Sequence, residues 1–280
     1  MSSPLQRSKA ALLEGSVRPW HVVFVLFVGW AVGIVAAGKL KSAFDPSIRT
    51  LAWLVLANGI SNAIYLAYVV VVPEFRRSLR FLFARPALGV GTRDIAWALA
   101  VTIFWGFGLY RVAILLPALT LRPDLFDFLR FADDVPPFDW RVLALLSLTA
   151  SIISPIGEEL LFRGYLMNLW IAKRGMWFGI VASSVVFGLF HGENALFAGI
   201  GGFVFALVYR KYQSLWPGIV LHATYNFLAP AWVLGWITAI KPRWDAANPS
   251  HWIVEFVLAI LFFPAAWQFW RRFRPGGARR

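Results

Sequence analysis

The residues of this sequence best suited to chemistry are polar side chains set inside long apolar runs. Glu158 and Glu159 lie in one such run, His191 ends a second, and His222 and Asn226 occupy a third. An ionisable group deep in an apolar helix is costly, so it usually faces a protein interior or a cavity. If these groups meet, they supply the parts for hydrolysis of an acyl bond. Glu158, aided by His191, would activate water, and His222 with Asn226 would stabilise the oxyanion.

Helical spacing indicates different roles for the two neighbouring carboxylates. Glu159 and Arg163 are four residues apart, so they share a helix face and can form a supporting ion pair. Glu158 is rotated by about 100° from that face, which leaves its carboxylate available as the catalytic base. His222 and Asn226 are also four residues apart, so both can reach the same oxyanion.

Each of these residues also has a structural interpretation. A buried Glu159–Arg163 pair can serve only to lock helices together. A single histidine in an apolar span is more often a hydrogen-bonding group between helices than a catalyst. The company of Glu158, His191 and His222 in one chain favours the catalytic interpretation.

The runs that carry these residues are long enough to be membrane-spanning helices. The chain is 59% hydrophobic with a mean hydropathy of +0.66, well above a soluble domain. Crossing a bilayer takes roughly 20 apolar residues, which predicts about eight spans and an all-α polytopic membrane protein. The spans are expected at 20–38, 51–72, 95–119, 140–172, 176–192, 195–209, 215–240 and 252–270.

Basic residues between the spans predict the orientation of the chain. Lysine and arginine in short connections mark the cytoplasmic side, and the acidic stretch 120–139 fits the outer side. In this orientation Lys39, Lys41 and Arg49 would lie on the outer side, but the larger basic clusters all support the same orientation. We therefore expect both termini in the cytoplasm and a location in the inner membrane of a prokaryote. The inner clusters are Arg76, Arg77, Arg80, Arg85 and Arg93; Lys173 and Arg174; Arg210 and Lys211; and Arg271, Arg272, Arg274, Arg279 and Arg280.

Charge and cysteine content exclude several classes of function. The net charge of +13 would suggest nucleic acid in a soluble protein. Here the basic residues flank apolar runs, so we expect membrane lipid as the partner and no nucleic acid; the basic stretch 74–93 is predicted to be a loop that contacts anionic headgroups. The absence of cysteine excludes disulfides, a cysteine nucleophile and cysteine metal ligands.

Three motifs in order resemble the signature of the CPBP family of intramembrane proteases. They are Glu158-Glu159-x-x-x-Arg163, Phe187-x-x-x-His191 and His222-x-x-x-Asn226. Each alone is weak, but together they are fairly specific. This family includes the type II CAAX prenyl endopeptidases and the Abi-type bacterial proteins. The resemblance implies eight helices around an intramembrane cavity and hydrolysis of a peptide bond near the membrane surface.

The resemblance covers roughly 140–230 and suggests a division of the chain into three parts. Residues 1–139 are expected to form supporting transmembrane helices. Residues 140–240 are expected to form the CPBP or Abi-like protease core. Residues 241–280 are expected to add a transmembrane helix and a basic tail.

The family has been described both as metalloproteases and as glutamate-dependent enzymes without a metal. If a metal is present, Glu158, His191 and His222 are the expected ligands, with zinc the leading candidate. The sequence has no His-Glu-x-x-His motif, and asparagine is an unusual zinc ligand. We favour water activation by Glu158 and His191.

Two other functions remain as alternatives. A non-catalytic membrane scaffold or immunity-type protein could keep this fold without the reaction. A proton-coupled transporter could use the same carboxylates and imidazoles as a relay, although no inverted repeat is visible. For a protease, the expected substrate is a peptide or a lipidated protein, and the sequence does not distinguish a prenylated from an unmodified one.

Overall fold

Helices form the regular structure of the residues that the computed structural model describes. These residues are 19–40, 49–86, 89–121, 144, 147–239 and 252–274, and no strand occurs among them. The all-α prediction is therefore confirmed for this part of the chain. The basic amino-terminal segment, nearly all of the acidic connection and the last residues of the tail lie outside the described ranges.

Each apolar run predicted as a span contains a helix. The simple ones are α2 (Pro19–Leu40), α3 (Arg49–Val71), α11 (Met176–Leu189), α12 (Ala195–Tyr212), α13 (Trp216–Ala239) and α14 (Ile253–Phe273). Two runs include wider π-helical turns. One consists of α5 (Thr92–Phe104), η2 (Trp105–Leu109), η3 (Arg111–Leu115) and α6 (Leu116–Leu121), and the other of η4 (Thr149–Ile153), α9 (Ser154–Glu159), η5 (Leu160–Met167) and α10 (Asn168–Arg174).

Several described helices are long and apolar enough to cross a membrane. Three meet this condition alone, namely Thr92–Leu121, Ala195–Tyr212 and Ile253–Phe273. A fourth meets it if α3 and the following helix count as one bent span. These helices are those of a membrane protein, while the total of eight crossings stays a prediction.

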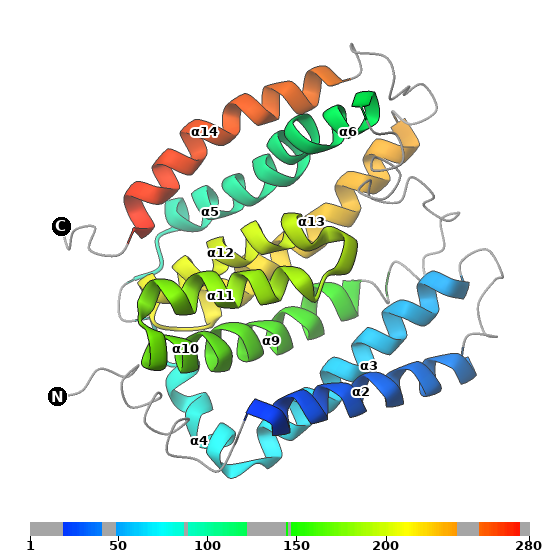
Figure 1. Cartoon of the computed structure of the whole chain (residues 1–280), viewed down its shortest axis with the longest axis vertical. Coiled ribbons are helices and arrows are strands. Elements are labelled where there is room, and N and C mark those ends of the chain that lie inside the picture. Colours follow the sequence, from blue (N-terminus) through cyan, green and yellow to red (C-terminus); the bar gives the residue numbers. More distant parts are fainter. Residues whose placement is uncertain are drawn as a thin grey trace.

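The helices lie side by side in a broad bundle (Figure 1). The α5–α6 run packs against α14 at one edge of the bundle, and α2 packs on α3 at the other. Between these edges, α11 and α12 pack against each other and against α10, η5 and α13. The helix with the paired glutamates, α9, lies between α3 and α13, so its side chains can reach residues from both sides.

Glycines bring several of these helices into close contact. A Cβ added at Gly33 of α2 would lie 2.4 Å from the carbonyl oxygen of Ala57 on α3. A Cβ at Gly188 of α11 would lie 2.3 Å from the carbonyl oxygen of Ala195 at the start of α12. Small residues at such crossings let helix backbones approach closely, as they commonly do in membranes. The second contact fixes the end of α11 just before His191.

The basic helix ends gather at one end of the bundle. The start of α5 and the ends of α10, α12 and α14 lie together there, at the left in Figure 1. Asp94 of α5 joins three of them because it accepts hydrogen bonds from Lys211, from Tyr212 at 2.6 Å and from Arg272 at 2.9 Å. Whether this end faces the cytoplasm stays a prediction.

The basic stretch after α3 is partly helical rather than a loop, so the prediction for 74–93 was wrong in part. Residues Pro73–Leu82 form α4, which is bent by 96° from α3. Phe75 and Leu82 of α4 are buried. The proline at its first position is well tolerated there, because that residue needs no amide donor inside the helix. The arginines of this amphipathic helix, Arg76, Arg77 and Arg80, are exposed.

Candidate functional site

The two glutamates lie where the helix that carries them changes its winding. Pro155 and Gly157 belong to α9, which ends at Glu159, and the wider π-helical turns of η5 begin at the next residue. π-Helical turns of this kind are frequent at functional sites. The carbonyls of Arg163 and Gly164 in η5 each accept a hydrogen bond of 3.0 Å from the Asn168 side chain.

Glu159 and Arg163 form a fully buried ion pair, as their spacing predicted. Nη1 of Arg163 donates to Oε1 of Glu159 at 2.9 Å, and both side chains have no exposed surface. Nη2 of Arg163 donates to the carbonyl of Gly202 on α12 at 2.8 Å. The guanidinium also lies over the ring of Phe187, 4.5 Å from its centre. The pair therefore connects the glutamate helix to both α11 and α12.

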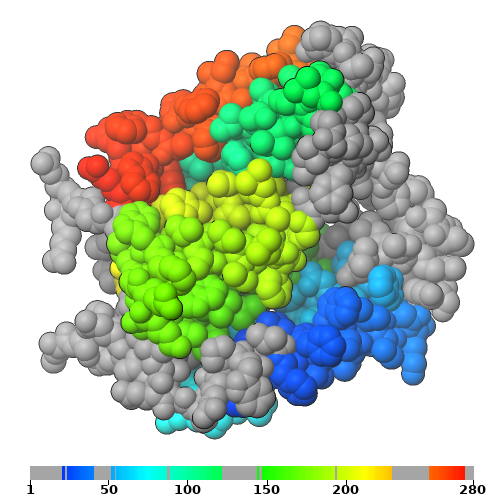
Figure 2. Space-filling view, viewed as in Figure 1, coloured from blue at the N-terminus to red at the C-terminus, as the bar shows by residue number. Residues whose placement is uncertain are grey.

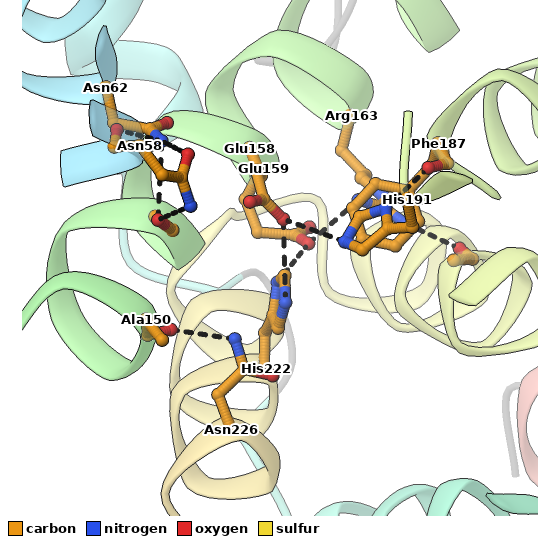
Figure 3. Close-up of polar contacts among 12 residues, drawn as sticks. Asn58, Asn62, Ala150, Glu158, Glu159, Arg163, Phe187, His191, His222 and Asn226 are labelled. Carbon is orange, nitrogen blue, oxygen red and sulfur yellow. Dashed lines mark hydrogen bonds and ion pairs between the residues drawn. The ribbon is translucent and has the colours of Figure 1, made fainter. Parts of the chain in front are cut away.

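His222 reaches this pair from α13 and contacts both glutamates. Its Nδ1 lies 3.2 Å from Oε1 of Glu159, and its Nε2 lies 3.7 Å from Oε2 of Glu158. The imidazole stacks on Phe205 of α12 with the ring centres 4.6 Å apart, and the residue is only 3% exposed. Figure 3 shows His222 directly beside the two carboxylates. A carboxylate at Nδ1 fixes the orientation of the ring and places a proton on that nitrogen.

His191 approaches Glu158 from the end of α11. Its Nδ1 lies 2.7 Å from the carbonyl of Phe187, which assigns the Nδ1 proton to that hydrogen bond. Its Nε2 lies 4.0 Å from Oε2 of Glu158. This distance is too long for a direct hydrogen bond and leaves room for one water between the two atoms. Oε2 of Glu158 makes no hydrogen bond in the described structure, so it can accept one.

Asn226 lies one turn beyond His222 on α13 but turns toward another helix. Its Nδ2 donates to the carbonyl of Ala150 at 2.7 Å, as Figure 3 shows. An asparagine amide has two N–H groups, so a second donor is left after this bond. The structure thus brings Glu158, His191 and His222 together, while Asn226 stands at the border of the cluster.

A cavity of about 610 Å³ opens beside Glu158 and His191. Its remaining walls come mainly from the first two helices, with Leu26, Phe27, Trp30 and Ile34 of α2 and Trp53, Ala57, Asn58, Ser61 and Asn62 of α3. Leu161, Phe162 and Phe190 complete it. Figure 2 shows α2 at the surface, beside the green segments that carry the two catalytic candidates. The amino-terminal helices thus form much of the cavity, a role that their lack of a motif did not predict.

A small polar network joins α3 to α9 next to the glutamates. Asn58 and Asn62 each donate to Oγ of Ser154 at 3.3 Å, and Asn62 also donates to Oδ1 of Asn58 at 2.8 Å. A Cβ at Gly157 would lie 2.6 Å from Oδ1 of Asn62, so a larger residue there would displace the Asn62 amide from its present position. No pattern in the sequence identified Ser154 or Gly157 as the contact of these asparagines on α9.

The arrangement around Glu158 was predicted to be able to hold zinc, and its donor atoms are of the right type. The Nδ1 hydrogen bonds leave the Nε2 atoms of His191 and His222 turned toward Glu158, as in metal sites whose ligands are oriented by outer partners. Yet no three histidine, aspartate or glutamate side chains of the described residues are placed so that they could hold a metal ion. The residues as they stand do not form a metal centre, so no step below uses one.

Comparisons with known proteins agree with the position of the site. Residues 140–228 match the family described as "Type II CAAX prenyl endopeptidase Rce1-like". The chain is 31% identical over 215 residues to a protein of Bacillus subtilis (strain 168) named "Putative membrane peptidase YdiL". The matched stretch covers 74% of this chain and 85% of that protein. No solved structure gives a significant match. The family match includes Glu158, Glu159, Arg163, His191, His222 and Asn226.

Proposed function

This chain belongs to the CPBP family of intramembrane proteases, and from that premise we propose that it is an endopeptidase in which Glu158 activates water. The observation that carries the proposal is the meeting of Glu158, His191 and His222 beside an apolar cavity. The three come from separate segments of the chain, so their convergence is a property of the fold rather than of one motif. The reaction is hydrolysis of a peptide bond near the membrane.

Water activation uses Glu158 and His191. A water between Oε2 of Glu158 and Nε2 of His191 would donate one hydrogen bond to each, since both atoms are acceptors in the assigned states. Glu158 removes one proton as the water oxygen attacks the carbonyl carbon of the substrate. His191 orients the water through the second hydrogen. General base catalysis of this kind typically contributes about 10²–10⁴ in rate.

The oxyanion that forms would be stabilised by His222 and Asn226. The proposed mechanism requires His222 to carry both ring protons, with Nδ1–H donating to Glu159 and Nε2–H, on the side of Glu158, available to the oxyanion. The charges then balance, because Glu158 and Glu159 carry two negative charges and Arg163 with His222 carry two positive ones. Asn226 adds its second N–H. When the tetrahedral intermediate breaks down, Glu158 returns the proton to the leaving amine and the C–N bond is cleaved.

The cavity fits a substrate with an apolar segment. Its walls are mostly aliphatic and aromatic side chains, with a few polar groups near Glu158, a composition common to sites that bind largely apolar ligands. We propose a membrane-associated peptide or a lipidated protein as the substrate class. The basic helix ends and the bacterial relative support a location in the inner membrane of a prokaryote, with both termini in the cytoplasm.

The test is cleavage of a mixed library of membrane peptides and prenylated peptides by the purified protein in detergent. Wild type is compared with Glu158→Gln and His191→Ala, each with and without a metal chelator. The matched control is Glu74→Gln, which alters a glutamate on α4 that does not line the cavity. We expect both site variants to lose at least about a hundredfold in kcat, the control to retain activity, and the chelator to have no effect.

Other outcomes select the alternatives. If both site variants still cleave the peptides, the assignment of Glu158 and His191 as catalytic residues is wrong. Activity abolished by chelator and restored by zinc would replace the water mechanism with a metal-dependent one. A biological role that Glu158→Gln leaves intact would favour the scaffold, and pH-driven flux in liposomes would favour the transporter.

A further inference from the structure

The cavity beside Glu158 has a second set of polar groups that the proposed reaction does not use. Asn58, Ser61 and Asn62 line it from α3, whereas Glu158 and His191 line it from the other half of the molecule. Asn58 is exposed although it lies in the middle of an apolar helix. An exposed amide at such a position is costly against lipid and is expected where a helix lines a water-accessible cavity.

The hydrogen bonds of these asparagines leave Asn58 with free capacity. Asn62 has both N–H groups engaged, with Oδ1 and the carbonyl of Asn58 and with Ser154. Asn58 donates a single hydrogen bond, to Ser154, and its Oδ1 accepts a single one, from Asn62. Because an amide has two N–H groups and two acceptor sites on its oxygen, Asn58 retains one donor and one acceptor. This is the combination that a peptide unit of another chain requires.

A substrate in this cavity needs such partners. The peptide groups of a helix are satisfied within the helix, but the bond to be cut must be exposed, which requires an extended stretch. Every unpaired N–H or C=O in an apolar surrounding is unfavourable. Outside the catalytic set, the polar side chains that line the cavity are those of Asn58, Ser61, Asn62, Trp30 and Trp53. The tryptophans can only donate, whereas Asn58 and Ser61 each have a donor and an acceptor that no hydrogen bond in the described structure uses. Of these two, Asn58 is exposed and Ser61 is only 9% exposed.

We propose that Asn58 binds the main chain of an extended substrate segment while Glu158 acts on a neighbouring bond. The 2.8 Å hydrogen bond from Asn62 to Oδ1 orients the Asn58 amide, whereas the longer bond to Ser154 joins α3 to α9. This inference rests on the proposed peptidase function and adds a residue that sets where an extended segment lies relative to Glu158. The subsite hydrogen-bonds a peptide unit and not a side chain. It should therefore accept different sequences but not segments that stay helical.

The experiment couples a change in the protein to a change in the substrate. A cleaved peptide is made with a single amide replaced by an ester at successive positions around the scissile bond, which removes one N–H without altering the side chains. KM and kcat are measured with wild type, Asn58→Leu and Ser154→Ala. Ser154→Ala is the matched control, because it removes the bonds that join the asparagines to α9 while leaving the Asn58 amide and its hydrogen bond from Asn62.

With wild type, we expect the ester at one position to raise KM about tenfold relative to the all-amide peptide, as for one lost hydrogen bond. With Asn58→Leu, the same ester should leave KM unchanged. Asn58→Leu itself should raise KM for the all-amide peptide by a similar factor with a smaller change in kcat. Ser154→Ala should keep the ester sensitivity. If Asn58→Leu does not fold, Asn58→Ala serves instead, because it removes the Oδ1 acceptor that the ester experiment tests and adds no charge to the cavity.

The outcomes separate this inference from the proposed function. If wild type cleaves but ester effects are equal in wild type and the Asn58 variants, the main-chain subsite is overturned and the peptidase stands. If Ser154→Ala loses the ester sensitivity as Asn58→Leu does, Asn58 acts through the α3–α9 contact and not on substrate. If wild type cleaves none of the peptides, the proposed function fails first.

Discussion

Nδ1 of His222 lies 3.2 Å from Oε1 of Glu159, the same oxygen that receives the hydrogen bond from Arg163. One carboxylate oxygen therefore orients both the guanidinium and an imidazole of the site. Since Nε2 of His222 lies 3.7 Å from Oε2 of Glu158, the fully buried Glu159 positions a group that contacts the proposed base. The two glutamates thus have opposite roles that mutation can separate.

Glu159→Gln is expected to destabilise the protein strongly. The change leaves Arg163 fully buried and without its carboxylate, and removing one partner of a buried ion pair typically costs about 3–5 kcal/mol. Glu158→Gln removes no hydrogen bond of Oε2 in the described structure, so it should change stability little while abolishing cleavage. Thermal unfolding in detergent measures both. Equal unfolding temperatures for the two variants would show that the proposed division between the glutamates is mistaken.

Gly188→Ala is expected to lower both stability and activity. Its Cβ would lie 2.3 Å from the carbonyl of Ala195, so α11 and α12 must separate, and His191 at the end of α11 would shift. The matched control is Gly201→Ala, whose Cβ meets no atom closer than 3.8 Å. Overpacking of this kind typically costs about 1–3 kcal/mol, whereas the control should match wild type in unfolding temperature and in kcat/KM. Identical behaviour of the two alanine variants would argue against close packing as the reason for Gly188.

Asp94→Asn is expected to loosen the end of the bundle where the basic residues gather. The carboxylate accepts from Lys211, Tyr212 and Arg272, which belong to two other helices. An asparagine keeps one acceptor and leaves two cations without a counter-charge, so we expect a loss of about 2–4 kcal/mol. Hydrogen exchange at the start of α5 and the end of α14 should increase more than near Glu158. Exchange that rises evenly over all helices would contradict a local clamp.

Asn226→Ala is expected to affect the rate of cleavage rather than substrate binding. Loss of one donor to an oxyanion lowers kcat by about 10²–10³ in other enzymes, with KM nearly unchanged. The hydrogen bond to the carbonyl of Ala150 gives the competing explanation, in which Asn226 only joins two helices. In that case unfolding temperature would fall and kcat would follow it, and Asn226→Asp, which cannot donate to Ala150, would be equally unstable.

Sequence periodicity predicted contacts within a helix better than contacts between helices. The apolar runs located the helices, because burial in lipid requires a continuous apolar stretch. The i,i+4 spacing predicted the Glu159–Arg163 pair, which is local. The bond from Arg163 to Gly202 and the bond from Asn226 to Ala150 were missed. Both involve backbone carbonyls on other helices, and no side-chain pattern identifies these.

The contribution of the amino-terminal helices was missed for a related reason. Trp30, Trp53 and Asn58 carry no motif, and their role appears only when α2 and α3 are placed against Glu158. The helix α4 was misjudged because its arginines made the stretch look like a loop, although Phe75 and Leu82 lie on one buried face. Charge density hid a helical pattern that a helical wheel of 73–82 would have displayed.

Most of the cavity wall lies in α2 and α3, outside the residues 140–228 that match the family. The proposed catalytic residues and most of the wall that a substrate would meet therefore lie in different segments of the chain. Substitutions on α2 and α3 at the cavity are expected to change which substrate is cleaved without altering Glu158 or His191. A chimaera that takes residues 19–71 from one relative and the rest from another should therefore follow the donor of its amino-terminal helices in what it cuts.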